Sequence, residues 1–244
     1  MAKLFESRNP IISEDSLRKT ISSASTHEDT MTISGAVNKT FILFALLMLT
    51  SGYSFLNPSM PLILVGAIGG LVAVIVSSFK PNLSPIIAPI YALLEGLFVG
   101  SISAMYAMEF DGIIGQAVIL TFGTLITMLL VHRSGLVPVT QKFRMGVFMA
   151  TGAIALAYVA SWIMSFFGMS MPYLHDSGPI GIGISVVIIG VAALNLLLDF
   201  DNFEKGEQAN APAYMEWFFA MGLLVTLVWL YIEFLRLLSK LNSD

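Results

Sequence analysis

The sequence predicts an all-α membrane protein built as a bundle of seven transmembrane helices. Of its 244 residues, 56% are hydrophobic and only 11% are charged, and the mean hydropathy is +0.83. A soluble domain carries about 25% charged residues, so lipid must act as the solvent for most of this chain. From Phe41 onward, apolar stretches alternate with short polar or acidic segments. Each stretch, at about 20 residues, is long enough to cross a hydrocarbon layer roughly 30 Å thick as a helix.

The first two of the seven spans are short, and the segment Asn57-Pro58-Ser59-Met60 joins them as a helical hairpin. A bundle of six spans is the alternative, if one segment does not cross the membrane. The expected spans are residues 41–56, 61–79, 84–106, 112–132, 145–167, 179–199 and 214–238.

The N-terminal segment differs from the rest of the chain because it is polar, rich in Ser and Thr, and holds both signs of charge. The first apolar run begins too late, and with the wrong flanks, for a secretory signal peptide. We interpret residues 1–36 as a cytoplasmic tail and residues 37–244 as the transmembrane domain.

The distribution of Lys and Arg predicts the orientation, since cytoplasmic loops accumulate these residues. The N-terminal tail and the loops after the second, fourth and sixth spans hold ten of the twelve. We therefore expect a protein of the plasma (bacterial inner) membrane with a cytoplasmic N-terminus. Seven spans place the C-terminus outside, where Arg236 and Lys240 run against the bias, whereas six spans would remove that conflict.

Small residues recur at helical spacing in three of the spans. Helices in lipid associate through close backbone contact rather than through apolar attraction, so these ridges predict tightly packed helices. They are Ala92, Gly96, Gly100 and Ala104 in the third span, Gly66 and Gly70 in the second, and Ala150, Ala153, Ala157 and Ala160 in the fifth.

The sixth span carries a stripe of small and polar residues that ends in a carboxylate. A stripe of this kind faces protein or water, not lipid. It is either a packing surface, with Asn195 as a hydrogen-bonding residue, or the wall of a polar cavity. Its members are Gly181, Ser185, Ile188, Ala192, Asn195 and Asp199.

Several acids lie in or near the expected spans. Glu95 is in the middle of the third span, where a charged residue costs roughly 2.5–3.5 kcal/mol to insert, so it must face the bundle interior. There it is either part of a proton or cation relay or a structural residue bonded to a neighbouring helix. Asp199 continues the polar stripe, whereas Asp201 points about 200° away from it on a helix, so the two cannot form a pair.

The last span holds two more acids. Glu233 lies one turn before Arg236, which is a candidate partner at this spacing. Glu216, near the start of the span, is expected at the membrane interface. Asp201, Asn195, Glu216 and Arg236 are therefore secondary candidates beside the main set of Asp199, Glu233 and Glu95.

The residues that many enzymes and cofactor proteins need are missing. The chain has no Cys, and its three His residues all lie outside the middle of the spans. It has no His-Glu-x-x-His motif, no nucleotide-binding loop and no basic patch for nucleic acid. We expect no enzyme activity, no bound cofactor and no nucleic-acid partner.

Two segments resemble motifs of the Bax inhibitor-1 family, also called the transmembrane Bax inhibitor motif proteins, in a bacterial branch with a longer N-terminal tail. The segment Leu198-Asp199-Phe200-Asp201-Asn202-Phe203 is similar to the motif that ends the family's sixth span, which reads Asp-Thr-Gln or Asp-Thr-Ser. The segment Leu230-Tyr231-Ile232-Glu233 is similar to Leu-Tyr-Leu-Asp in the family's last helix, with Glu in place of Asp. The resemblance covers about residues 36–241 and includes the third span around Glu95.

The resemblance implies a seven-helix bundle with a pH-sensitive calcium leak. Two carboxylates that share a site titrate there as a coupled pair and control the pore; carried over, they are Asp199 and Glu233, which are also the possible calcium ligands. However, Phe200-Asp201 replaces Thr-Gln or Thr-Ser, and a last helix that begins at Ala213 puts Glu233 about 30 Å along it. The pair then requires a later start or a bend near Gly222; otherwise Glu216 is the acid nearer Asp199.

We thus expect a passive, pH-controlled cation leak with calcium as the permeant ion. The alternative is a non-conducting regulator that binds another membrane protein, such as a quality-control protease, through its small-residue ridges and its polar tail.

Overall fold

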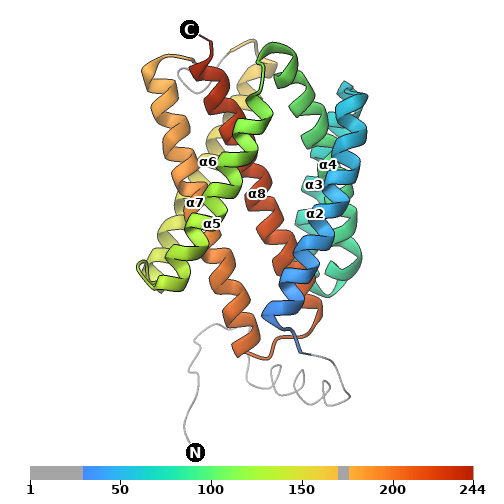
Figure 1. Ribbon diagram of the computed structural model, residues 1–244, viewed down its shortest axis with the longest axis vertical. Coiled ribbons are helices and arrows are strands. Elements are labelled where there is room, and N and C mark those ends of the chain that lie inside the picture. The colour runs from blue at the N-terminus through green and yellow to red at the C-terminus, as the bar shows by residue number, and fades with distance from the viewer. Residues whose placement is uncertain (1–29, 170–175, 244) are drawn as a thin grey trace, which may run out of the picture.

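A computed structural model describes residues 30–169 and 176–243, and almost all of these are helical (Figure 1). Seven helices of this described part are long and apolar enough to cross a membrane, as the sequence predicts. The short 3₁₀ helix η1, Pro81–Leu83, precedes α4. The long helices are α2 (Ile33–Leu56), α3 (Met60–Phe79), α4 (Ser84–Glu109), α5 (Ile113–Ser134), α6 (Gln141–Phe166), α7 (Pro179–Gln208) and α8 (Tyr214–Leu241).

Successive helices run in opposite directions, so the bundle has two distinct ends (Figure 1). We call the end where α2 begins the N-terminal end; it also holds the connections 80–83, 135–140 and 209–213. The opposite, C-terminal end holds the connections 57–59 and 110–112 and the end of α8. Because α8 finishes at the end opposite to the start of α2, the described helices cross seven times.

Helix α2 begins at Ile33, eight residues before the expected span. Thr32 caps it, because its hydroxyl accepts a hydrogen bond from the Gly35 amide at 2.9 Å. Two acids from elsewhere complete the cap: Glu216 accepts from the Thr32 amide and Glu207 from the Ile33 amide, both at 2.9 Å. Residues 30–36 of the expected tail therefore belong to the fold, and the rest of the tail, 1–29, lies outside the described residues.

Small residues bring α2, α3 and α4 together, as their spacing predicts. A Cβ atom added at Gly96 or Gly100 of α4 would overlap backbone atoms of α2. A Cβ at Gly66 of α3 would lie 2.6 Å from the Leu94 carbonyl oxygen of α4. Close backbone approach is the usual basis of helix association in lipid, so these three helices form one tightly packed unit.

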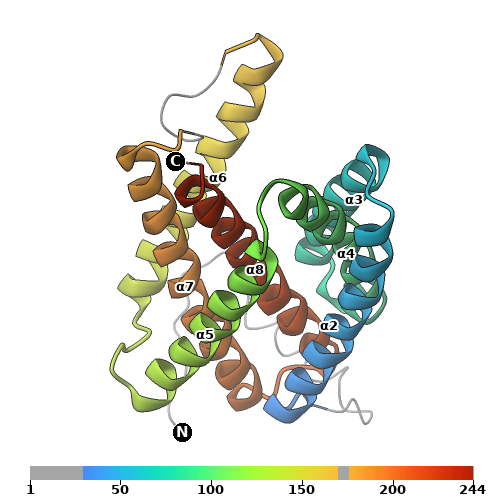
Figure 2. The same ribbon diagram turned by 45° about the horizontal axis from the view of Figure 1, so that its top comes forward.

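Helix α8 is the central helix of the bundle. It packs against α2, α4, α5 and α7, and Figure 2 shows it crossing between them. Leu224, Leu230 and Leu235 are fully buried along its length. By contrast, α6 packs mainly against α7, and most of its side chains are exposed to the surroundings. None of the four alanines of the fifth-span ridge is buried, so this ridge does not form a tight helix contact like those of α3 and α4.

The contact between α2 and α4 predicts a sharp difference between two glycines. Gly100→Ala should lower the midpoint of thermal unfolding in detergent, because the added methyl group overlaps the Ser51 backbone and overpacking typically costs about 1–3 kcal/mol. Gly123→Ala is the control, since a Cβ there meets nothing within 4 Å. Equal midpoints for the two variants would show that this contact is not close in solution.

Candidate functional site

Asp199 lies on α7 near the N-terminal end, beside α8. A Cβ at Gly222 would lie 3.9 Å from its Oδ1 atom, and Thr226 lies one turn further along α8 on the same side. Its Oδ2 atom is fully buried and has no hydrogen-bond partner among the described residues. Asp199 also lines a cavity of about 180 Å³, between α3, α7 and α8. A buried acceptor without a partner is costly, so this carboxylate is available to a ligand or a proton.

The stripe that leads to Asp199 faces protein, as the sequence predicts. Gly181, Ser185, Ile188 and Ala192 are buried. Asn195 donates from Nδ2 to the Thr151 hydroxyl of α6 at 2.8 Å and to the Val191 carbonyl at 2.9 Å. The stripe is thus both a packing surface and, at its Asp199 end, a cavity wall.

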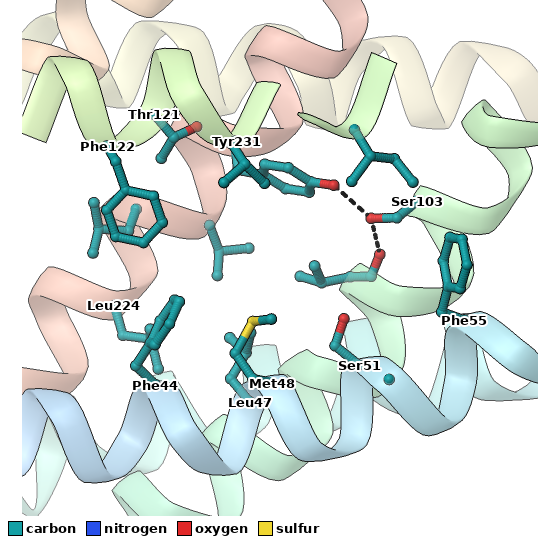
Figure 3. A pocket seen from close by; sticks show the side chains of 16 residues that line it. Phe44, Leu47, Met48, Ser51, Phe55, Ser103, Thr121, Phe122, Leu224 and Tyr231 are labelled. Atoms are coloured by element: carbon teal, nitrogen blue, oxygen red, sulfur yellow. Dashed lines mark hydrogen bonds between the residues drawn. The ribbon is translucent and has the colours of Figure 1, made fainter. Parts of the chain in front are cut away.

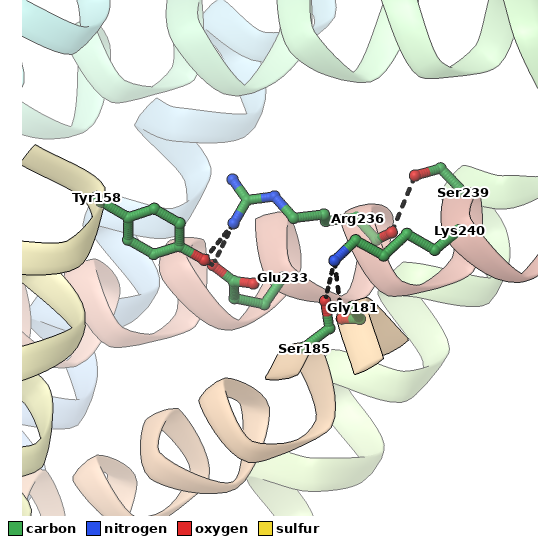
Figure 4. A network of polar contacts seen from close by, with 7 residues as sticks. All are labelled: Tyr158, Gly181, Ser185, Glu233, Arg236, Ser239 and Lys240. Atoms are coloured by element: carbon green, nitrogen blue, oxygen red, sulfur yellow. Dashed lines mark hydrogen bonds and ion pairs between the residues drawn. The ribbon is translucent and has the colours of Figure 1, made fainter. Parts of the chain in front are cut away.

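Glu233 is 1% exposed and lies in a polar network toward the C-terminal end (Figure 4). The Tyr158 hydroxyl of α6 donates to its Oε1 atom at 2.7 Å, and Arg236 Nη1 lies 3.0 Å from the same atom. Arg236 also donates to the Tyr158 hydroxyl, and its guanidinium group lies over the Tyr158 ring. The Oε2 atom of Glu233 is buried without a hydrogen-bond partner in the described chain.

Lys240 extends this network to the first turn of α7. Its Nζ atom donates to the Gly181 carbonyl and to the Ser185 hydroxyl, both at 2.9 Å (Figure 4). Lys240 is 4% exposed, so it is an interior residue and not one of the surface cations by which orientation is judged.

One face of α8 connects the Asp199 cavity with the Glu233 network. Residues at helical spacings of three and four share a face of the helix. On α8, residues at this spacing run without a break from Phe218 in the cavity lining to Lys240. We call it the site face of α8; it comprises Phe218, Gly222, Val225, Trp229, Glu233, Arg236 and Lys240.

The structure does not bring the Asp199 and Glu233 carboxylates together. Asp199 lies beside Gly222 and Thr226, and Glu233 is seven to eleven residues further along α8, which is about 10–17 Å of helix rise. Helix α8 starts at Tyr214, so no later start shortens this separation. Glu216 is not the substitute partner either, because it caps α2.

Glu95 lies halfway along α4, on the side that faces α3. A Cβ at Gly70 of α3 would lie 2.6 Å from its Oε2 atom, and among the described residues no hydrogen bond to its carboxyl group is found. Val74, one turn from Gly70, lines the Asp199 cavity. The Glu95 carboxyl group therefore lies against α3, one helical turn from the part of α3 that lines the Asp199 cavity.

Two further acids of α7, Asp201 and Glu204, lie close to basic side chains at the N-terminal end. Asp201 binds Arg144 of α6 and lies 2.8 Å from Lys205, and Arg144 Nη1 donates to Asn202 at 2.7 Å. His132 of α5 lies 3.1 Å from Glu204. Asp201 thus points away from Asp199, as helical geometry requires, and has structural partners of its own.

Sequence reasoning identified Arg236 as a partner of Glu233 but missed Tyr158 and the interior position of Lys240. Tyr158 is 75 residues from Glu233, so spacing could not show the contact. The available signal was that an aromatic hydroxyl in a lipid-embedded helix needs a polar partner. No group of three or more acidic or His side chains in the described chain could hold a metal ion.

The fold and these contacts define a multipass helical membrane protein with carboxylates enclosed between its helices. The family described as Bax inhibitor 1 like matches residues 9–243. The chain therefore belongs to the Bax inhibitor-1-like family, in agreement with the two motifs in the sequence. No curated protein and no solved structure matches the chain.

The Glu233 network predicts a large loss of stability when only one partner is removed. Arg236→Met leaves the Glu233 carboxylate buried without its cation and should lower the free energy of unfolding by about 3 kcal/mol. Adding Glu233→Gln to Arg236→Met should restore part of that loss, because the orphaned charge is gone. Thermal unfolding of the single and double variants measures this, and strictly additive effects would contradict the pairing.

Proposed function

We propose that this protein is a passive, pH-sensitive cation leak with calcium as the permeant ion, in the plasma (bacterial inner) membrane. The N-terminal end of the bundle would face the cytoplasm, because the connection 80–83 and the helix ends there carry Lys80, Arg133, Lys142 and Lys205. The observation that carries the proposal is Asp199, whose buried Oδ2 atom lacks a hydrogen-bond partner in the described chain beside a cavity open to a small ligand.

The path would follow the site face of α8 between α6 and α7. It starts at Asp199, passes the Asn195–Thr151 hydrogen bond one turn away, and reaches Glu233. Trp229 lies on this face between the two acids by helical spacing. Glu95, next to the Asp199 cavity, would be a second acid near the entrance.

The few oxygen ligands at each position along the proposed path suit a calcium ion that binds only briefly. Calcium prefers oxygen ligands, carboxylates above all, but conduction requires binding weak enough for the ion to leave. A complete shell of several carboxylates would trap the ion. Single acids at separate levels, without a cluster of three in the described residues, suit a leak better than a storage site.

Control by protons would act through the charge of Asp199. The cavity lining contributes no other charged side chain: Val74 and Ser78 come from α3, and α8 contributes apolar residues and Gly222. Arg144 of α6, a cation at the same end of the bundle, is already bound to Asp201 and Asn202. When Asp199 gains a proton, the cavity therefore loses its negative charge, and no other charged side chain of the described lining replaces it.

Flux measurements in proteoliposomes test this role. Asp199→Asn removes the charge permanently, so calcium flux should change and its difference between two pH values should shrink or vanish. Glu109→Gln is the control, since Glu109 is exposed at the end of α4, and it should behave as the wild type. Equal flux and equal pH response in wild type and Asp199→Asn would remove Asp199 from the mechanism.

The second candidate is a non-conducting regulator that binds a membrane protein such as a quality-control protease. The α4 ridge is already buried against α2, so it cannot dock a partner; the poorly covered α6 favours this candidate instead. A pull-down that compares the full chain with a chain lacking residues 1–29 separates binding through the N-terminal tail from binding through α6. Unchanged recovery of the partner after deletion would count against a role for the tail and leave α6 as the docking surface.

A further inference from the structure

A second cavity lies in the half of the bundle nearer the C-terminal end, away from the acids. Its volume is about 340 Å³, and α2, α4, α5 and α8 form its walls (Figure 3). The lining is dominated by aliphatic and aromatic side chains, among them Phe44, Leu47 and Met48 of α2 and Leu224 of α8.

Three of the four hydroxyl groups in this lining are bonded to protein, and only that of Ser51 on α2 forms no hydrogen bond among the described residues. The Ser103 and Tyr231 hydroxyls lie 2.7 Å apart, and Ser103 also contacts the Val99 carbonyl at 2.7 Å. Thr121 donates to the Ala117 carbonyl at 2.7 Å. A buried water needs two to four polar partners, so this lining favours an apolar occupant.

The cavity opens sideways between α2 and α5. Side chains on both lips are exposed: Met48 by 52%, and Phe55, Val118 and Phe122 by 38% each. Toward the N-terminal end, the rings of Phe44 and Phe122 meet edge to face with centroids 5.7 Å apart and close the opening. In a membrane, the exposed lips face lipid.

The cavity is long and runs parallel to the helices. Its lining on α2 extends from Phe44 to Phe55, which is about 16 Å of helix rise. One leaflet fills about half of a hydrocarbon core roughly 30 Å thick, so the cavity matches the length of one acyl chain.

We propose that this cavity binds an acyl chain of a phospholipid from the leaflet at the C-terminal end of the bundle. The chain enters through the gap between α2 and α5 and ends against the Phe44–Phe122 ring pair. The binding site is separate from the acids of the proposed ion path, so it stands whether or not the protein conducts ions.

Photo-crosslinking in bilayers tests the proposal. The full chain is reconstituted with a phospholipid that carries a diazirine on one acyl chain, irradiated and digested, and labelled peptides are measured by mass spectrometry. Segments 44–55 of α2 and 114–122 of α5 should be labelled several times more than the lipid-facing surface of α6.

Two glycine variants make the test specific. A Cβ at Gly52, on the cavity lining, meets nothing within 4 Å, so Gly52→Leu places a larger side chain at the opening from an unobstructed position and should reduce labelling to the level of α6. Gly123→Leu is the control, because Gly123 also has free space but lies outside the lining; it should keep the preference. Thermal unfolding of both variants confirms that they fold.

Three results would overturn the proposal. Uniform labelling of all lipid-facing helices would show that the cavity has no preference for an acyl chain. Unchanged labelling in a folded Gly52→Leu variant would place the lipid elsewhere. Labelling of segments 44–55 and 114–122 below that of α6 would show that lipid is excluded from the cavity by another occupant.

Discussion

A polar group that faces hydrocarbon without a partner costs several kcal/mol, and α8 carries three charged residues along a single face. Glu233, Arg236 and Lys240 therefore determine how the bundle is assembled around this helix. Tyr158 from α6 and Ser185 from α7 supply the partners of these residues. Helices α6 and α7 must accordingly lie against this face, while the apolar remainder of α8 packs against α2, α4 and α5.

The sequence was sufficient for the features that depend on local spacing. Apolar length predicted the seven spans, and glycine spacing predicted a close helix contact at Gly96 and Gly100, although not that α2 would be the partner. It failed where a contact joins distant segments. The start of α2 at Ile33 depends on carboxylates of Glu207 and Glu216, more than 170 residues away, and hydropathy does not register a helix end that is capped from another part of the chain.

The candidate site was predicted in part, for the same physical reason. The cost of insertion marked Glu95 as an interior residue, the polar stripe marked Asp199, and the spacing to Arg236 marked Glu233; none of the three carboxyl groups faces lipid freely. Their mutual placement depends on how α7 and α8 cross, which no periodicity encodes. The crossing sets Asp199 beside Gly222 rather than beside Glu233, so any communication between the two acids must pass along the helices and the groups between them.

Helix α8 also separates two kinds of interior space. The Asp199 cavity contacts Phe218, Gly222 and Val225, whereas the apolar cavity contacts Leu224, Leu227, Val228 and Tyr231. The two linings share no residue of α8, but they adjoin, because Phe219 and Met221 also line the Asp199 cavity, and Met221 and Val225 lie three residues before Leu224 and Val228. An apolar occupant on one side and a cation on the other therefore meet no common side chain of α8. A displacement of α8 as a rigid rod would change both cavities at once, because the helix forms part of both walls.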